Sequence, residues 1–329
     1  MKYGARAAQA GALICFLAGS VHAAFAAGQI VTFDPSGSVD TYAYAINSAW
    51  AGTGYYKDGS GDFHGFLRTA DGTITSFGVS GTNYTYPVSI NTAGAIAGYS
   101  QGTSGYDGFI RAPDGTITTF DAFASSTTPI ALNDKGIVVG SYFENNMWHA
   151  FIRRTDGSVT SFDPAGSIAS FPFAINRRRT IAGEYLDSQD IYHGFARANG
   201  TVTSFDPTGS QYTSPTAIND KGTITGAYED SSGAFHGFVR TSGGTITSFD
   251  PNGSTGTFPT GIDDKGAVAG YYSDGSHATH GFVMSAGGKF KTFDPTGSTY
   301  TRPQAITIGG IAGWFNDGSN MAHGFLRSR

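Results

Sequence analysis

The stretch 216–254 reads TAINDKGTITGAYEDSSGAFHGFVRTSGGTITSFDPNGS, and it contains the signals that decide the fold. Asn219-Asp220-Lys221-Gly222 is a turn sequence, because Asn can bond its own backbone and Gly can take a positive φ. Gly243-Gly244 is a second turn, typical of a tight β-hairpin. Short runs of β-branched and aromatic residues stand between the turns. We therefore predict four strands, over 216–219, 223–228, 236–240 and 245–249.

The same unit recurs along the whole chain. Its last Phe is found seven times, 42 to 44 residues apart, and an Ala-Ile-Asn-like phrase and a His-Gly-Phe-like phrase recur equally often. The seven positions of this Phe are Phe33, Phe77, Phe120, Phe162, Phe205, Phe249 and Phe293. A four-stranded unit of about 43 residues with Gly-rich turns is typical of one β-propeller blade.

Large apolar residues stand on both faces of the last two strands of the unit, as Phe238 and Val239 do on neighbouring positions. A sheet buried on both faces needs a neighbour on each side, which blades around an axis provide. A parallel β-helix is the rival fold, but its coils are shorter and would not repeat a hairpin. The predicted fold class is an all-β, seven-bladed β-propeller with four antiparallel strands per blade.

The N-terminal segment 1–26 has the composition of a signal peptide. Lys2 and Arg6 precede an apolar run over 10–21, and Ala24-Phe25-Ala26 suits signal peptidase. The run is too short for a membrane-spanning helix. Cys15, the only cysteine, lies inside this segment. We expect an exported protein, extracellular or periplasmic, with one propeller domain over 27–329 and neither a disulfide nor a membrane span.

The two ends of that domain complement each other. Residues 29–33 match a lone fourth strand, whereas the last unit stops after the third strand, which contains Phe325. We expect Gln29–Phe33 to pair with that strand and close the ring, since closure leaves no free edge.

Composition excludes several classes of protein. The 48 glycines disfavour helical bundles, and the 14% of aromatic residues argue against a disordered chain. A net charge of −5 disfavours a nucleic-acid partner, whose binding depends on Lys and Arg. We expect a monomer without a cofactor.

The repeated phrases together resemble the bacterial extracellular repeats of the HAF type, named for His-Ala-Phe. That tripeptide stands once here, at His149-Ala150-Phe151, and five other units have Gly in its middle. The resemblance covers 27–327 and implies a propeller fold and export, but no catalytic residues. Local departures are Asp107 in place of His, Gly78 in place of Asp, and 177–179, where three Arg replace an Asp-Lys-Gly turn.

Repeated polar residues are interpreted as structural, because repeats encode packing whereas sites need local asymmetry. We expect each repeated His to bond an adjoining loop, each Asn to form a turn and each Arg to lie at a solvated strand end. The His residues are His64, His149, His193, His236, His280 and His323. Loops such as 230–233 contain one acid each, which favours turn chemistry over a calcium site.

Function is therefore sought where the units differ. Strand direction places the longer loops, between the second and third strands and between units, on one face. Aromatic rings beside acids on this face suit sugar stacking or a protein contact. The candidate ligand residues are Glu144, Trp148, Glu184, Tyr192, Glu229 and Trp314, with Tyr56, Lys57 and His277 nearby. The alternative is that Trp148 and Tyr192 only cover a blade edge.

Our first hypothesis is a secreted, non-enzymatic module that binds a glycan or a protein through this face. The alternative is a polysaccharide hydrolase or lyase at the axial mouth, which needs converging carboxylates such as Glu144, Glu184 and Glu229. A structural role in the cell envelope is a third reading. The triple Arg at 177–179 is interpreted as a solvated turn, with an anionic partner as its alternative.

Overall fold

The computed structural model describes residues 27–102, 105–123 and 126–329, and the signal peptide expected over 1–26, with Cys15, lies outside them. Within these ranges the secondary structure consists of β-strands, with no helix. None of these residues forms a helix long and apolar enough to cross a membrane.

The strands come in groups of four along the chain, each an antiparallel sheet paired in sequence order. The first two groups are β2 (Ser38–Ile46), β3 (Gly52–Asp58), β4 (Phe63–Arg68) and β5 (Ile74–Phe77), then β6 (Thr85–Ile90), β7 (Ile96–Gln101), β8 (Tyr106–Arg111) and β9 (Ile117–Phe120). The next two are β10 (Ser126–Leu132), β11 (Val138–Glu144), β12 (Met147–Arg153) and β13 (Val159–Phe162), then β14 (Ser167–Ile175), β15 (Ile181–Asp187), β16 (Tyr192–Ala198) and β17 (Thr201–Phe205).

The remaining strands continue this order. They are β18 (Ser210–Ile218), β19 (Ile224–Asp230), β20 (Phe235–Arg240) and β21 (Ile246–Phe249), then β22 (Ser254–Ile262), β23 (Val268–Asp274), β24 (Thr279–Met284) and β25 (Phe290–Phe293). The last group is β26 (Tyr300–Ile306), β27 (Gly310–Asn316) and β28 (Ala322–Ser328), and β1 (Ile30–Phe33) is its fourth strand. Single parallel pairings, Phe235 with Gly256 and Thr279 with Tyr300, connect the later groups.

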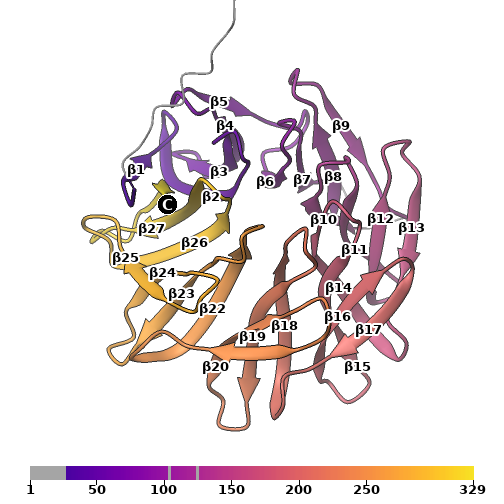
Figure 1. Ribbon diagram of the computed structural model, residues 1–329. Coiled ribbons are helices and arrows are strands. Elements are labelled where there is room, and N and C mark those ends of the chain that lie inside the picture. The colour runs from indigo at the N-terminus through magenta and orange to yellow at the C-terminus, as the bar shows by residue number, and fades with distance from the viewer. Residues whose placement is uncertain (1–26, 103–104, 124–125) are drawn as a thin grey trace, which may run out of the picture.

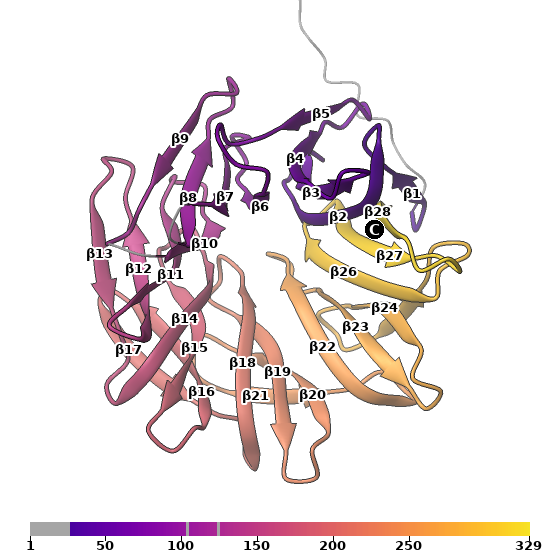
Figure 2. The same ribbon diagram turned by 180° about the vertical axis from the view of Figure 1, so that it is seen from behind.

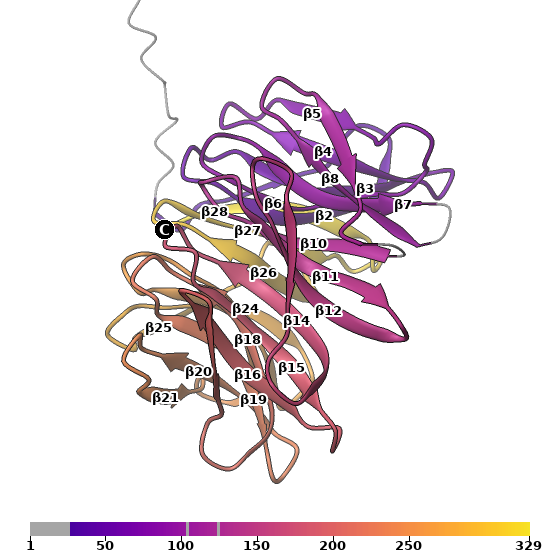
Figure 3. The same cartoon turned by 90° about the vertical axis from the view of Figure 1, so that its right-hand side faces the viewer.

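The groups follow one another around a common centre (Figures 1 and 2). The first strand of each group lies nearest that centre, and the fourth lies outside (Figure 1). Seen from the side, neighbouring groups lie next to one another (Figure 3). Each sheet therefore has a neighbouring sheet against its faces, as its two-sided apolar pattern requires.

The first strand of the unit begins earlier than the sequence predicted. We expected 216–219, but β18 runs from Ser210 and contains Pro215, with register shifts between Ser210 and Tyr212 and between Pro215 and Ala217. Pro lacks the N–H of a ladder donor, yet this innermost strand has a full antiparallel partner on one side only, so an edge position tolerates it. The other three strands of the unit lie within two residues of their predicted bounds.

Pairs of phenylalanines join each unit to the next. The Phe that ends the fourth strand meets, edge to face, the fully buried Phe of the next third strand: Phe205 and Phe238 have ring centroids 6.0 Å apart. The Gly before the buried Phe makes room for the ring of its own unit, because a Cβ on Gly237 would lie 2.5 Å from the Phe249 ring. Burying each such ring contributes roughly 1.5–3 kcal/mol.

The two ends of the described chain meet in one sheet. β1 pairs antiparallel with β28, with Ile30 opposite Arg327 and Phe33 opposite Gly324. Phe33 packs on Phe66 with centroids 5.6 Å apart, in the same edge-to-face manner as the other pairs. The pairing that the sequence predicted for Gln29–Phe33 is therefore present over Ile30–Phe33.

Candidate functional site

The strand ends define two faces of the molecule. The short-turn face contains the turns between first and second strands and between third and fourth strands. These turns are tight, as shown by the backbone bonds from Gly222 N to the Asn219 carbonyl and from Gly244 N to the Thr241 carbonyl, each 2.9 Å. The long-loop face contains the loops between second and third strands and between units.

Asparagines on the short-turn face link successive units. Asn176 Oδ1 accepts the N–H groups of Arg178 and Thr180 in its own turn, and its Nδ2 donates to the Asn219 carbonyl of the next unit at 2.9 Å. The same inter-unit bond starts from Asn47, Asn91, Asn133, Asn176 and Asn219. The predicted turn role is therefore confirmed, and the inter-unit bond was missed.

One acid interrupts this series. Asp263 has no side-chain N–H to donate, and its buried carboxylate pairs instead with the Arg329 guanidinium, which also donates to the Thr307 carbonyl at 3.4 Å. Arg329 thus contacts the carbonyl of the following unit, where an Asn side chain would otherwise bond.

The sequence predicted that the repeated arginines lie at solvated strand ends. They do not. Each guanidinium stacks over the Phe of the preceding unit, as Arg240 does over Phe205 at 4.6 Å and Arg327 over Phe293 at 4.5 Å. Burial lowers the pKa of Arg240 and of Arg327. That prediction was wrong because the contact joins residues of different units, and a pattern within one unit does not show it.

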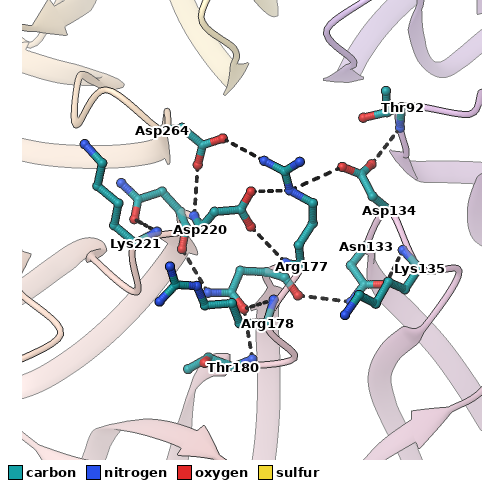
Figure 4. Close-up of polar contacts among 12 residues, drawn as sticks. Thr92, Asn133, Asp134, Lys135, Arg177, Arg178, Thr180, Asp220, Lys221 and Asp264 are labelled. Atoms are coloured by element: carbon teal, nitrogen blue, oxygen red, sulfur yellow. Dashed lines mark hydrogen bonds and ion pairs between the residues drawn. The ribbon is translucent and has the colours of Figure 1, made fainter.

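Arg177 and three carboxylates lie together on the short-turn face (Figure 4). The Arg177 guanidinium contacts Asp220 directly and lies 3.8 Å from Asp134 Oδ2 and 3.5 Å from Asp264 Oδ2. Asp220 and the other two carboxylates raise its pKa. The first Arg of the triple is thus an internal counter-ion, and it is not a free cation.

Four histidines on the long-loop face, His193, His236, His280 and His323, each bridge two carboxylates. His236 Nδ1 lies 2.7 Å from Asp250, which follows the fourth strand, and Nε2 lies 3.2 Å from Asp230 in the preceding loop. Asp230 Oδ1 accepts the N–H groups of Ser232 and Ala234, so the loop acid also performs the predicted turn role. His323 makes the equivalent bond to Asp34, next to β1, at 2.8 Å. The predicted bonding of His to adjoining loops is confirmed.

These carboxylates shift the pKa of the histidines. The bond to Asp250 raises the pKa of His236. For His193, His280 and His323, burial alone would lower the pKa, but two carboxylates raise it overall. No group of three or more His, Cys, Asp or Glu suited to a metal ion is present within the described ranges.

Aromatic rings in mutual contact connect neighbouring units, most of them from positions within the first and second strands. We call this set the aromatic arc, and its neighbouring members have ring centroids 5.0 to 6.5 Å apart. In order of contact it consists of Tyr106, Tyr99, Tyr86, Tyr55, Tyr42, Trp314, Tyr300, Tyr271, Phe258, Phe235, Tyr212 and Tyr192. Burial raises the pKa of Tyr86 and Tyr99 to about 12, so these phenols stay neutral.

Glu184 lies at one end of the arc. It occupies the position after the repeated second-strand Gly, which other units fill with Tyr, Trp, Ser or Ala. It is 6% exposed and forms no ion pair with any described residue. The Tyr212 hydroxyl donates to its Oε2 at 3.1 Å. Burial raises the pKa of Glu184, and hydrogen bonds from Ser214 and Tyr212 partly oppose that rise. Burial and Glu184 in turn raise the pKa of Tyr212 to about 12.

Three of the predicted ligand residues lie close to Glu184. Tyr192 contacts Tyr212 at 5.3 Å, and Glu229 stands opposite Tyr212 in the β18–β19 register. Trp148 packs on Phe171 at 6.3 Å, and Phe171 stands opposite Glu184. The structure thus brings Trp148, Glu184, Tyr192 and Glu229 together through Tyr212 and Phe171, two residues that the sequence reading missed.

The other candidates lie elsewhere. Trp314 stacks on Tyr300 at 5.2 Å in the last group, in another part of the arc. Glu144 ends β11 opposite Met147, at the position of the loop acids. Tyr56 is buried and bonds Ser76, and His277 takes a positive φ in its loop. Lys57 pairs with Asp40 in the β2–β3 register.

Exposed apolar side chains gather on the long-loop face. Among the described residues, the large apolar side chains with more than a third of their surface exposed are Val39, Tyr106, Phe123, Met147, Ile168, Ile191, Ile308 and Met321. All of these except Ile308 belong to the long-loop side. Apolar exposure concentrated on one face is typical of an interaction surface.

No protein-family model matches the sequence, and no curated protein matches it. Solved structures match the fold. A streptogramin B lyase is 15% identical with a TM-score of 0.60, covering 92% of this chain and 98% of that chain. Virginiamycin B lyase from Staphylococcus aureus is 13% identical with a TM-score of 0.61, covering 92% and 99%. The β-propeller domain of the trilobed protease from Pyrococcus furiosus is 9% identical with a TM-score of 0.61, covering 88% and 94%. The chain has a β-propeller fold. At these identities the likeness concerns the fold alone.

Proposed function

We propose that the chain is an exported seven-bladed β-propeller of the HAF-repeat type, closed by β1, which binds a glycan on its long-loop face. Glu184 carries the proposal. Burying a carboxyl group without a cation is costly, and such groups are found preferentially at functional sites. Its neighbours are Tyr212, Tyr192 and Trp148, whose rings suit stacking against the apolar face of a sugar.

Glycan arrays and pull-downs from cell-envelope extracts test this proposal. We expect a saturable ligand that Glu184→Gln and Trp148→Ala each weaken by about tenfold or more, as central contacts do. Asp62→Asn removes an acid from the same face in another unit and should leave binding unchanged. The proposed glycan site is wrong if no glycan on the array binds, or if the extract yields a protein ligand only. It is also wrong if Asp62→Asn weakens binding as much as Glu184→Gln does.

A hydrolase or lyase at the same place is the second candidate, because Glu184 has the raised pKa that a general acid needs. Glu144, Glu184 and Glu229 do not occupy equivalent positions in their units, and of the three Glu184 is buried. New reducing ends or unsaturated products from a polysaccharide panel, abolished in Glu184→Gln, would favour this candidate over binding alone.

A further inference from the structure

Charge is divided unequally between the two faces. The Lys and Arg residues of 27–329 stand in or beside the short turns, except for Lys57, Lys291 and Arg302. Most of the acids, by contrast, belong to the long-loop side, where the histidines bind many of them. A chain of net charge −5 therefore presents one cationic face.

The acids of the short-turn face are already engaged. Asp71, Asp114 and Asp156 each accept a backbone N–H within their own turn, at 2.9 to 3.0 Å. Asp134, Asp220 and Asp264 surround Arg177, and Asp263 pairs with Arg329. None of the other Lys and Arg residues of this face forms an ion pair with a described residue, although Asp156 and Arg154 interact electrostatically at longer range.

Two neighbouring grooves open among these cations. The first, about 250 Å³, lies between the third and fourth units, and its cationic lining consists of Arg154, Arg178, Arg179 and Arg197. The second, about 280 Å³, lies between the fourth and fifth units, and Arg178, Lys221 and Arg240 line it beside Thr and Ser hydroxyls. No acid lines either groove, and Arg178 belongs to both.

Three of these arginines are free to bind an anion. Arg154, Arg178 and Arg179 are exposed, and none forms an ion pair with a residue that the structure describes. Burial and the nearby charge of Arg154 lower the pKa of Arg197, because like charges crowd the first groove. Arg179 has a φ of 67°, at a position where several other units place Gly. The turn bond from Arg179 N to the Asn176 carbonyl fixes this conformation, which Trp50 also takes at the equivalent position of the first unit.

We propose that these two grooves form one binding site for an acidic polysaccharide, separate from the proposed glycan site on the long-loop face. Arg154, Arg178, Arg179 and Arg197 would contact its carboxylates, since a guanidinium matches a carboxylate with two parallel hydrogen bonds. The Thr and Ser hydroxyls of the second groove suit its hydroxyl groups.

The grooves fit this partner better than a membrane or a nucleic acid. A membrane surface would favour exposed apolar side chains for insertion, yet of the large exposed ones among the described residues only Ile308 lies on this face. Single-stranded nucleic acid would favour aromatic rings for base stacking, and neither groove is lined by one.

Fluorescence polarisation with labelled oligogalacturonate tests the proposal, and a neutral dextran oligomer of the same length is the control ligand. We expect binding of the acidic oligomer that weakens as salt rises, and no binding of dextran. R178Q/R179Q should weaken it by about tenfold or more, because two charge-assisted contacts are lost. K265Q/K289Q removes the same charge from the same face outside the grooves and should change affinity less than twofold.

Other outcomes would overturn the proposal. These are absence of binding by the folded wild-type chain, equal losses in the two double variants, equal binding of dextran, or preference for anionic phospholipid vesicles or for DNA over the oligogalacturonate. Melting temperatures of both variants establish that they fold. Glu184→Gln should leave this binding unchanged, which separates failure of this site from failure of the long-loop site.

Discussion

The two faces of the propeller are built from the same repeated unit but differ in what the repeat specifies. On the short-turn face the repeated side chains bond one unit to the next, as Asn176 does to Asn219. Within the second strands, and not in the long loops where the sequence placed Glu184 and Trp314, the positions that meet between units hold different residues, such as Tyr55, Glu184 and Trp314. The difference indicates that identical residues hold the molecule together, whereas differing residues are available for a ligand.

The fourth unit is the exception that tests this division. Its turn replaces an Asp-Lys-Gly-like sequence by Arg177, Arg178 and Arg179 on the otherwise repetitive short-turn face. Arg177 is bound by three carboxylates, whereas Arg178 and Arg179 line the grooves. On this face, the residues that depart from the repeat, Arg178 and Arg179, are cations without an ion pair to any described residue. Elsewhere in the molecule, the residue that departs from the repeat is the buried acid Glu184.

The largest effect is expected at the joint between the chain ends. If β1 forms the same joint as any other fourth strand, Phe33→Ala and Phe249→Ala should each lower the free energy of unfolding by about 3–5 kcal/mol. Both rings meet the buried Phe of the next unit. Urea unfolding measures the free energy of unfolding of both variants. A loss for Phe33→Ala below about 1 kcal/mol would show that the ends are joined less tightly than the units.

A second, smaller effect concerns the asparagines of the short-turn face. Asn47→Ala removes the turn cap on Ala49 and Ala51 and the bond to the Asn91 carbonyl, so we expect a loss of about 2–3 kcal/mol. Asn47→Asp keeps the Oδ1 cap but sets a buried carboxylate oxygen against the Asn91 carbonyl, without the cation that Asp263 has in Arg329, so it should cost at least as much. An Asn47→Asp variant as stable as the wild type would argue that the inter-unit bond contributes nothing.

The histidines of the long-loop face predict a pH dependence. The folded state raises the pKa of His193, His236, His280 and His323, so the stability they add is complete below about pH 6.5 and is lost as pH rises through the folded pKa. The pKa of Asp274 is lowered to about 2, so its contribution is lost as pH falls toward that value.

Maximum stability is therefore expected between about pH 4 and 6.5. The melting temperature should fall by roughly a few degrees as the pH rises to 9. Scanning calorimetry across this range measures it. A variant with all four histidines changed to Gln should lose the alkaline slope, and an unchanged slope in that variant would assign the effect to other groups.

The smallest effect separates the three arginines of the fourth unit. Arg177→Gln leaves Asp134, Asp220 and Asp264 without their counter-ion and should cost about 0.5–1 kcal/mol, less at high salt, because Arg177 is exposed. Arg178→Gln has no ion pair to lose and should leave the melting temperature unchanged. A larger loss of stability in Arg178→Gln than in Arg177→Gln would contradict the assignment of Arg177 as an internal counter-ion.

Sequence alone predicted the all-β propeller fold, the repeated turns and the bonding of His to loops, because each depends on a pattern within one unit. It missed the Asn176 bond to the next unit and the stacking of Arg240, since both join units. It nominated Glu184 as a difference between units. It did not predict that Glu184 is buried beside Tyr212, because that depends on how neighbouring blades pack.

Hydrogen exchange of the backbone amides of Ile30–Phe33 tests most directly whether the same inter-unit contacts continue across the chain ends. If β1 completes the last sheet as a permanent strand, its ladder amides should exchange as slowly as those of β21, an equivalent fourth strand. Exchange as fast as that of an unstructured peptide would contradict the closed ring and the division of roles between the two faces.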